Sequence, residues 1–447
     1  MKNTLPSYTE CKEANLPWLG RIPAHWELER AKWLFTKMER PVRESDDVIT
    51  CFRDGTVTLR KNRRVTGFTE SLQEIGYQGV RKGDLVIHIM DAAAGAIGVS
   101  DSNGKSTPVY IVLTPNDGIL SHYYAPLLQE MARQKWIDAL AKGIRQRSVD
   151  FRYDTFSSQI LCIPPFSEQR AITRYLEWAD ERIQRLIKAR EKQIELLEEY
   201  KQAIIQQAVT GQIDVRTGEP YPDYKDSGVE WLGKVPAKWN VLCIKYLASL
   251  KSGENITSQN INDKDTYAVY GGNGIRGFCS SYTHSGEFVL IGRQGALCGN
   301  INYAKGNFWA SEHAVVATPK QKYELIWFGE MLRIMDLNQY SLAAAQPGLS
   351  VYQIENLKIP VPPISEQFNI SEYIERKTAA INKTIKTTRN KIDLLMEYRT
   401  RLIADVVTGK VDVRQAAANL PDREDQFENQ LLVRVEHDLE GDNYANQ

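Results

Sequence analysis

The stretch IPPFSEQ at residues 163–169 returns as VPPISEQ at residues 361–367, which lie 198 positions further along the chain. A second stretch, TGQIDVR at 210–216, returns with the same offset of 198 as TGKVDVR at 408–414. The segment that joins these two landmarks therefore has the same length in both copies. A repeat of about 200 residues is too long for a solenoid unit, so we expect two copies of a domain plus a connector.

A third landmark opens each copy. WLGRIPAHW at 18–26 returns as WLGKVPAKW at 231–239, but 213 positions later instead of 198. The stretch between this opening and the Pro-Pro landmark is thus 15 residues shorter in the second copy, and its sequence hardly matches the first. We expect a constant frame that carries two different domains.

Each constant segment has the pattern of a long amphipathic helix. Pro164 and Pro165 exclude a helix just before the first one, Ser167 is its expected N-cap, and Thr210-Gly211 is its expected end. We expect a helix of about 40 residues, which is about 60 Å long. Its apolar stripe recurs every three or four residues, with Arg190 at the one polar step, and comprises Ile172, Leu176, Ala179, Ile183, Leu186, Ile194, Leu197, Ile204 and Ala208.

The second copy repeats this stripe in the same register. Helices of this length cannot bury their stripes on small domains of their own, so we expect them to pack on each other as an antiparallel coiled coil. The alternative is that each stripe packs on a partner protein. The second stripe comprises Ile370, Ile374, Lys377, Ile381, Ile385, Thr388, Ile392, Leu395, Leu402 and Val406.

The regions before the helices mix strand and helix signals, so the expected fold class is α+β. In the first region a turn at 82–84 precedes a strand at 85–89, a second strand is expected at 109–113, and residues 124–140 have helical spacing. In the second region the clearest strands are 288–292 and 314–317. The expected organisation is a mixed α/β domain at 1–162, a long helix with its connector at 163–216, a second mixed α/β domain at 217–360, a second long helix at 361–414, and an acidic tail at 415–447.

Composition points to a cytoplasmic protein without membrane contact. The chain has 447 residues and its 56 basic and 56 acidic residues cancel. There is no run of about 18 consecutive apolar residues and no signal-peptide pattern. The six cysteines are scattered without a C-x-x-C pair, so neither a disulfide frame nor a zinc site is expected. A reducing cytoplasm is the simplest location for such a chain.

Because the chain is neutral, a nucleic-acid surface would have to come from local segregation of charge. Arg and Gln are the side chains that pair bidentately with guanine and adenine edges. The competing interpretation of each cluster is a solvated face or ordinary loop chemistry. The candidate DNA-binding residues are Arg53, Arg60, Lys61, Arg63 and Arg64, then Arg145, Gln146, Arg147 and Arg152, and in the second domain Arg276, Arg293, Lys305 and Gln346.

Sequence motifs give no indication of catalysis. GNGIRG at 272–277 satisfies G-x-G-x-x-G, but a dinucleotide site would need a helix to begin there. The following FCSSYT at 278–283 favours strands and turns, so we expect either a glycine-rich turn that brings the backbone close to a neighbouring group, or a hairpin. The chain contains no G-x-x-x-x-G-K-[ST], H-E-x-x-H or G-x-S-x-G sequence, and its six histidines are isolated. We expect no catalytic residue and no metal site.

The order of landmarks resembles the specificity subunit of type I restriction–modification enzymes. The resemblance rests on Trp-Leu-Gly-x-x-Pro-x-x-Trp, a variable domain, Pro-Pro-x-x-Glu-Gln, a long helix and Thr-Gly-x-[Ile/Val]-Asp-Val-Arg, in this order and twice over, from about residue 16 to residue 414. GGNGIRG at 271–277 and IGRQG at 291–295 also resemble phrases of that family's target-recognition domains.

The resemblance implies that each variable domain is a target-recognition domain that reads one half of a split, asymmetric site on double-stranded DNA. It implies that the helices set the spacing and dock two adenine-N6 methyltransferase subunits, and that two motor–nuclease subunits complete the complex. S-adenosylmethionine, ATP and Mg²⁺ would belong to those partners and not to this non-catalytic chain. The alternative is a scaffold or adaptor that binds two proteins and no DNA.

Overall fold

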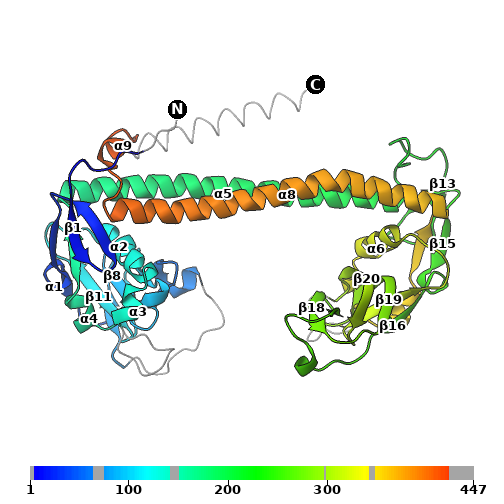
Figure 1. The fold of residues 1–447 in the computed structure, drawn as a ribbon, viewed down its shortest axis with the longest axis horizontal. Helices are drawn as coiled ribbons and strands as arrows, with labels where there is room; N and C mark the ends of the chain where they lie inside the picture. Colours follow the sequence, from blue (N-terminus) through cyan, green and yellow to red (C-terminus); the bar gives the residue numbers. More distant parts are fainter. Residues whose placement is uncertain (1–4, 64–74, 141–150, 296–297, 342–347, 422–447) are drawn as a thin grey trace. The chain divides into compact units, whose positions relative to one another are not determined.

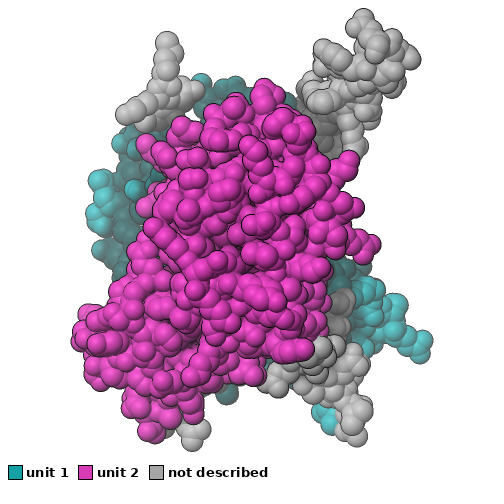
Figure 2. Space-filling view, turned by 90° about the vertical axis from the view of Figure 1, so that its right-hand side faces the viewer, with its two compact units in different colours: residues 1–188, 392–447 teal, residues 189–391 magenta. Residues whose placement is uncertain are grey.

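A computed structural model describes residues 5–63, 75–140, 151–295, 298–341 and 348–421. The chain forms two compact units: unit 1 contains residues 1–188 and 392–447, and unit 2 contains residues 189–391 (Figure 2). Each unit combines one globular region with parts of both long helices. We call the globular regions head 1 (residues 5–163) and head 2 (residues 217–361).

The two long helices are α5 (Phe166–Val209) and α8 (Ile364–Val407), each of 44 residues. The amides of Glu168 and Gln169 donate to the carbonyl of Pro165, so α5 begins at Phe166. The prediction of Ser167 as N-cap is therefore wrong by two residues, because the proline carbonyl already starts the helical hydrogen bonds. Gly211 follows the end of α5 in the left-handed conformation (φ 74°), as predicted for the glycine there.

In unit 1 the first part of α5 packs against the last part of α8 (Figure 1). Ile183 of α5 lies in one buried cluster with Leu402 and Val406 of α8. The guanidinium of Arg399 donates to the carboxylate of Asp180 across the same pair of helices. The beginning of one helix thus lies beside the end of the other.

In unit 2 the last part of α5 packs against the first part of α8. Ile204 shares a buried cluster with Ile381 and Ile385, and Arg389 forms an ion pair with Glu198 at 3.5 Å. Within each unit the helices run in opposite directions, which confirms the predicted antiparallel coiled coil.

The predicted apolar stripes need two corrections. Leu186 is 50% exposed, whereas its neighbour Ile187 is buried. Lys377 is exposed on α8, and Thr378 is buried in its place. Leu186 and Ile187 are both apolar, so steps of three and of four residues fit the sequence equally well and only the packing decides between them.

Head 1 is built on a four-stranded antiparallel sheet in the order β4-β11-β8-β9. The predicted strands at 85–89 and 109–113 are β8 and β11. The elements of head 1 are β1 (Cys11–Leu16), β2 (Leu19–Pro23), β3 (Glu27–Arg30), α1 (Ala31–Leu34), β4 (Phe35–Lys37), β5 (Ile49–Cys51), β6 (Val57–Leu59), β7 (Gln78–Val80), β8 (Leu85–His88), β9 (Ile97–Val99), β10 (Gly104–Ser106), β11 (Tyr110–Pro115), α2 (Ser121–Arg133), α3 (Trp136–Leu140), α4 (Tyr153–Ser157) and β12 (Ile160–Ile163).

The predicted helix at 124–140 is two helices, α2 and α3. The chain breaks at Lys135, whose φ of 59° is incompatible with a right-handed helix. Residues 133–135 are Arg, Gln and Lys, which are good helix formers, so this break could not be predicted from residue types.

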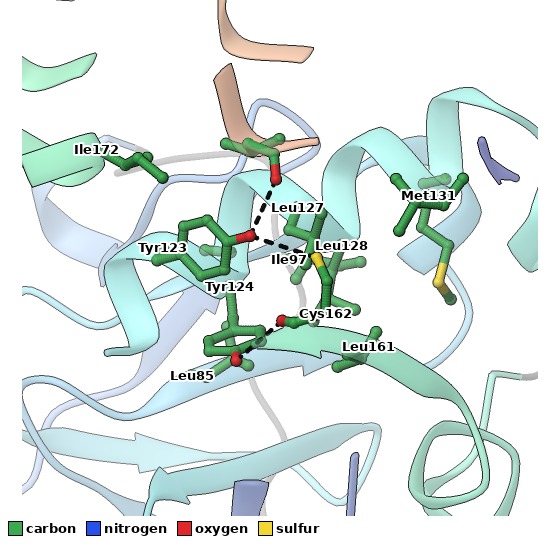
Figure 3. Packing of buried hydrophobic residues seen from close by; sticks show 14 of the residues in the cluster. Leu85, Ile97, Tyr123, Tyr124, Leu127, Leu128, Met131, Leu161, Cys162 and Ile172 are labelled. Atoms are coloured by element: carbon green, nitrogen blue, oxygen red, sulfur yellow. Dashed lines mark hydrogen bonds between the residues drawn. The ribbon is translucent and has the colours of Figure 1, made fainter. Parts of the chain in front are cut away.

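Helix α2 fixes head 1 on the helix ends of its own unit (Figure 3). The hydroxyl of Tyr123 donates to the backbone carbonyl of Val407 at the end of α8 (2.9 Å) and lies 3.4 Å from the sulfur of Cys162. The hydroxyl of Tyr124 donates to the carbonyl of Cys162 in β12 (3.2 Å). All of these side chains are fully buried, so their polar atoms need these partners.

Head 2 is built on a six-stranded sheet in the order β16-β21-β19-β20-β17-β18. Among the described strand pairs of this sheet, only β17 and β20 are parallel. The predicted strands at 288–292 and 314–317 lie in β19 and β21. The elements of head 2 are β13 (Tyr224–Asp226), β14 (Lys234–Pro236), β15 (Asn240–Cys243), β16 (Ala248–Ser252), β17 (Tyr267–Gly271), β18 (Gly274–Cys279), β19 (His284–Gly292), β20 (Ile301–Ala310), β21 (Ala314–Pro319), α6 (Leu325–Ile334), α7 (Val351–Glu355) and β22 (Lys358–Val361).

Both units contain the same corner between a glycine and a buried proline–tryptophan pair. In unit 2 a Cβ on Gly211 would lie 2.5 Å from Pro236, which stands next to the buried Trp239. In unit 1 a Cβ on Gly409 would lie 2.3 Å from Pro23. The Thr-Gly landmark of one sequence copy therefore packs on the Trp-Leu-Gly landmark of the other copy.

The backbone repeats this correspondence. The amide of Asp214 donates to the carbonyl of Glu219 (2.7 Å), and the amide of Asp412 donates to the carbonyl of Pro6 (2.8 Å). The two bonds are equivalent, although the partners are five residues apart in unit 2 and come from distant parts of the sequence in unit 1. The last described element, α9 (Arg414–Ala418), follows this point, and residues 422–447 of the acidic tail lie outside the described residues.

A buried carboxylate completes the corner in unit 1. The carboxylate of Glu168 accepts hydrogen bonds from the hydroxyl of Tyr8 (2.5 Å) and from Nε1 of Trp26 (2.9 Å), and Nε2 of His25 lies 2.8 Å from it. Burial, followed by the hydrogen bond to this carboxylate, raises the pKa of Tyr8 far above its usual value. The N-terminal segment is thereby tied to the first turn of α5.

Unit 2 has a sparser version of this centre. Glu366 accepts a hydrogen bond from the hydroxyl of Tyr221, and Nε1 of the buried Trp239 has no hydrogen-bond partner among the described residues. Lys238 stands where unit 1 has His25. The frame is thus repeated in shape but not in all of its polar contacts.

Candidate nucleic-acid interface

In head 2 the hairpin at residues 271–274 meets the loops that contain Gln294 and His313 at one edge of the sheet. The hairpin of β17 and β18 confirms the predicted glycine-rich hairpin at 272–277, since Gly271 lies opposite Gly274. The carbonyls of Gln294 and His313 lie 3.2 and 3.4 Å from where a Cβ of Gly272 would be. A side chain at Gly272 would therefore crowd the two neighbouring loops.

Backbone hydrogen bonds hold the loops of this edge in place. The amide of Arg293 donates to the carbonyl of His313 (2.8 Å), and the amide of Leu349 donates to the carbonyl of Arg293 (2.9 Å). The guanidinium of Arg293 donates to the hydroxyl of Ser252 (3.1 Å). Arg293 is thus half-buried and bonded at both its backbone and its side chain, which makes it a positioned residue instead of a freely moving cation.

The side chains around Arg293 are polar. Nδ1 of His313 lies 3.0 Å from the amide oxygen of Gln294, and the amide of Asn300 donates to that of Asn273 (2.7 Å). Amides and imidazoles can both donate and accept hydrogen bonds, as base edges require. Gln294 and His313 were not among the predicted site residues, although the phrase IGRQG at 291–295 contains Gln294.

The other two predicted residues of head 2 that the structure describes lie apart from this edge or at its border. Arg276 is exposed on β18, and its side chain lies against Gly271. A Cβ on Gly271 would lie 2.5 Å from Cδ of Arg276. Lys305 lies opposite Glu287 within the ladder of β19 and β20 and pairs with it at 3.3 Å. The structure therefore brings Arg276 close to the loops and leaves Lys305 out on the strands.

In head 1 acidic neighbours pair with most of the first basic cluster. Arg53 pairs with Asp91 (2.9 Å), Lys61 with Asp47 (2.5 Å) and Arg63 with Asp54 (2.8 Å). The guanidinium of Arg63 also lies over the ring of Phe52, and Nε of Arg60 lies 3.4 Å from the hydroxyl of Thr50. Each of the three cations Arg53, Lys61 and Arg63 thus has a carboxylate partner in the structure. Exposed pairs of this kind contribute about 0–1 kcal/mol each, so a phosphate could replace the carboxylate at low cost.

Arg152 lines a groove of about 1020 Å³ in head 1 together with Lys37, Arg40 and Tyr153. The ammonium of Lys37 lies over the ring of Tyr153 at 5.5 Å. Tyr110, which also lines this groove, meets His88 edge to face, and burial raises the pKa of Tyr110 to about 12. The lining of the groove thus combines cationic side chains with aromatic rings.

Five predicted DNA-binding residues lie outside the described residues: Arg64, Arg145, Gln146, Arg147 and Gln346. Within the described ranges, no three His, Cys, Asp or Glu side chains come together as a metal site. No helix in the same ranges has the length and apolar character needed to cross a membrane. All six cysteines are free.

The repeated frame, the paired helices and the two unlike heads define a two-headed protein built on an antiparallel coiled coil. A family model described as "Type I restriction modification DNA specificity domain" matches residues 236–393. The Escherichia coli type I restriction enzyme EcoprrI specificity subunit is 40% identical over 149 residues, which are 32% of this chain and 37% of that relative. The chain thus spans little more than a third of the length of this relative.

The resemblance extends over most of the chain at lower identity. The putative type I restriction enzyme MjaX specificity subunit of Methanocaldococcus jannaschii is 22% identical over 444 residues, 89% of this chain and 96% of that one. A chain from a solved structure that concerns assembly of the type I R-M system has a TM-score of 0.65 at 14% identity, covering 87% of this chain and 99% of that one, and so shares the fold. Over residues 236–393 this chain is thus similar to the DNA specificity domain of type I restriction–modification systems, and over most of its length it shares the fold of that solved chain.

Proposed function

We propose that this chain is the non-catalytic DNA-reading subunit of a type I restriction–modification complex. Head 1 and head 2 each read one half of a split, asymmetric site on double-stranded DNA. The observation that carries the proposal is a frame that is repeated in detail, down to the equivalent bonds of Asp214 and Asp412. This frame bears two heads whose main sheets have four and six strands among the described residues. A protein that reads two unlike half-sites needs this combination of constant frame and variable heads.

The helices expose an apolar pair at equivalent places in the two units. Leu196 and Tyr200 of α5 are 52% and 60% exposed, and Leu394 and Tyr398 of α8 are 63% and 54% exposed. Each pair is spaced by four residues, so its members share a helix face. The two pairs are separated by the repeat offset of 198. Two equal patches of large apolar side chains fit two copies of one partner.

We propose that these patches dock two adenine-N6 methyltransferase subunits, one on each unit. Two motor–nuclease subunits complete the restriction complex. S-adenosylmethionine, ATP and Mg²⁺ bind to those partner subunits and not to this chain. The complex functions in the cytoplasm. The similarity to type I specificity subunits and the duplicated patches support this assignment.

The stoichiometry of the complex tests the docking patches. Leu394→Glu with Tyr398→Ala should remove one methyltransferase subunit, and Leu196→Glu with Tyr200→Ala the other, as measured by native mass spectrometry of the co-expressed complex. The matched control is Leu186→Glu, because Leu186 is equally exposed on α5 but the equivalent position of α8 holds Thr384. If the control changed the stoichiometry and the patch variants did not, the docking proposal would be wrong.

DNA binding itself separates the proposal from the adaptor alternative. Neutral net charge and the acidic partners of Arg53, Lys61 and Arg63 favour an adaptor, so both outcomes are informative. We expect a salt-sensitive electrophoretic shift of duplex DNA by the complex with methyltransferase, and a weaker shift by the chain alone. A complex that assembles but shifts no DNA at about 50 mM salt would identify the chain as an adaptor.

A further inference from the structure

The central sheets of the two heads share one register. In head 1, β8 pairs with β11 so that Leu85 lies opposite Leu113. In head 2, β19 pairs with β21 so that Val289 lies opposite Ala317. β11 ends at Pro115, which pairs with the first residue of β4, and β21 ends at Pro319, which pairs with the first residue of β16. Residues 85–90 of head 1 therefore correspond to residues 289–294 of head 2, although the two sequences do not align here.

The loops beyond these strands make the same backbone hydrogen bonds. The amide of Ile89 donates to the carbonyl of Val109 (2.9 Å), as the amide of Arg293 does to that of His313 (2.8 Å). The carbonyl of Ile89 in turn accepts from the amide of Phe151 (3.1 Å), as that of Arg293 accepts from Leu349 (2.9 Å). Each head thus has one edge at which three loops are held in the same way. We call it the reading edge: residues 89–90, 108–109 and 151–152 of head 1, and residues 293–294, 312–313 and 349–350 of head 2.

The side chains on this shared backbone differ in chemistry. Met90 of head 1 is 54% exposed and apolar, and the equivalent Gln294 of head 2 is exposed and polar. Val109 of head 1 corresponds to His313, which bonds to Gln294 at 3.0 Å. At the third segment Arg152 of head 1 corresponds to Ser350.

A fixed backbone that presents interchangeable side chains is what a set of readers with different targets requires. The groove of about 1020 Å³ in head 1 is lined by all three segments of its reading edge. In head 2 the glycine-rich hairpin approaches the same edge, because Gly272 leaves room for the carbonyls of Gln294 and His313. Two independent features, a groove and a close-approach glycine, thus single out the reading edge in the two heads.

We propose that the reading edge determines the base specificity of each head, and that Met90 and Gln294 are specificity-determining residues at equivalent positions. This inference rests on the proposed function. The amide of Gln294 offers the donor and acceptor that match an adenine edge, and the side chain of Met90 offers apolar contact of the kind that a thymine methyl accepts. One position of the fold thus reads different bases in the two half-sites.

The test is sequencing of adenine-N6 methylation in cells that express the complete complex. Gln294→Met should change base preference within one half-site by about tenfold or more and leave the other half-site and the spacer unaltered. Met90→Gln should change only the other half-site. The matched control is Gln321→Met, the same substitution on an exposed residue beyond the opposite end of β21, and it should leave the motif unchanged.

The outcomes separate this inference from the proposed function. A truncating variant, Gln294→Ala, is measured in parallel, so that a defect caused by the larger side chain does not decide the result. If the wild-type complex methylates a bipartite motif and all edge variants retain that motif, the reading edge is not the specificity determinant. The same holds if a single substitution changes both half-sites. If the wild-type complex methylates no bipartite motif, the proposed function itself is overturned.

Discussion

Replacing Glu168 with Ala should destabilise the corner of unit 1 more than any equivalent change in unit 2. The carboxylate of Glu168 is almost fully buried and accepts from the hydroxyl of Tyr8 and from Nε1 of Trp26. Removing it leaves both donors buried without a partner, at about 1–3 kcal/mol each, so the expected loss is about 2–6 kcal/mol. The contact with the partly exposed His25 adds little, because water screens it.

The repeat supplies the control for this prediction. Glu366 occupies the equivalent position in unit 2 and accepts only from the hydroxyl of Tyr221 among the described residues. Glu366→Ala should therefore cost about 1–3 kcal/mol. Hydrogen-exchange mass spectrometry measures both effects in one chain, because it reports the local opening free energy of residues 5–30 and of residues 221–240 separately.

A double-mutant cycle identifies the cause of the loss. Tyr8→Phe removes the hydroxyl and keeps the ring, so the cost of Glu168→Ala should be smaller in that background than in the wild type. Equal protection of residues 5–30 in the wild type and in Glu168→Ala would refute the reasoning. So would a larger effect of Glu366→Ala on its own unit.

Three further predictions concern the frame. The carboxylate of Asp412 accepts a hydrogen bond from Arg414, which lowers the pKa of this carboxyl below its usual value. The pair therefore stabilises the fold above about pH 4, and this stabilisation is lost as the pH falls through the lowered pKa. Asp412→Asn should lower the melting temperature at pH 7, and the difference from the wild type should vanish in acid. Gly409→Ala should cost more than Gly118→Ala in denaturant melts, since both positions have positive φ but only Gly409 faces Pro23, and equal costs would contradict the packed corner. Inserting one heptad at the same level in α5 and α8 lengthens each helix by about 10 Å, so the gap between the methylated half-sites should grow by about three base pairs, and an unchanged gap would exclude the helices as the spacer.

The sequence predicted the frame well because its landmarks are tied to backbone geometry. Pro-Pro excludes a helix and Thr-Gly ends one, so both long helices were placed correctly within a few residues. The face of the helix was harder to predict, since Leu186 and Ile187 are adjacent and equally apolar. The break between α2 and α3 was missed because Lys135 adopts a left-handed conformation without glycine or proline beside it.

The candidate interface was only partly predictable. Basic residues close in sequence indicated a charged surface, but the acids that pair with Arg53 and Lys61 lie 38 and 14 positions away. Such pairs arise only when the sheet is assembled. The equivalence of Met90 and Gln294 depends on strand register and on hydrogen bonds between loops, which no spacing in this chain reveals.

The most direct test of two unlike heads that read one split site is methylome sequencing of the host with the gene present and deleted. We expect an adenine-N6-methylated motif with two different half-sites and a fixed gap, present with the gene and absent without it. Exchanging residues 240–359 for the corresponding domain of a type I specificity subunit with a different target should then replace only one half of that motif. A palindromic motif, a motif that survives the deletion, or an exchange that alters both halves would contradict independent reading by the two heads.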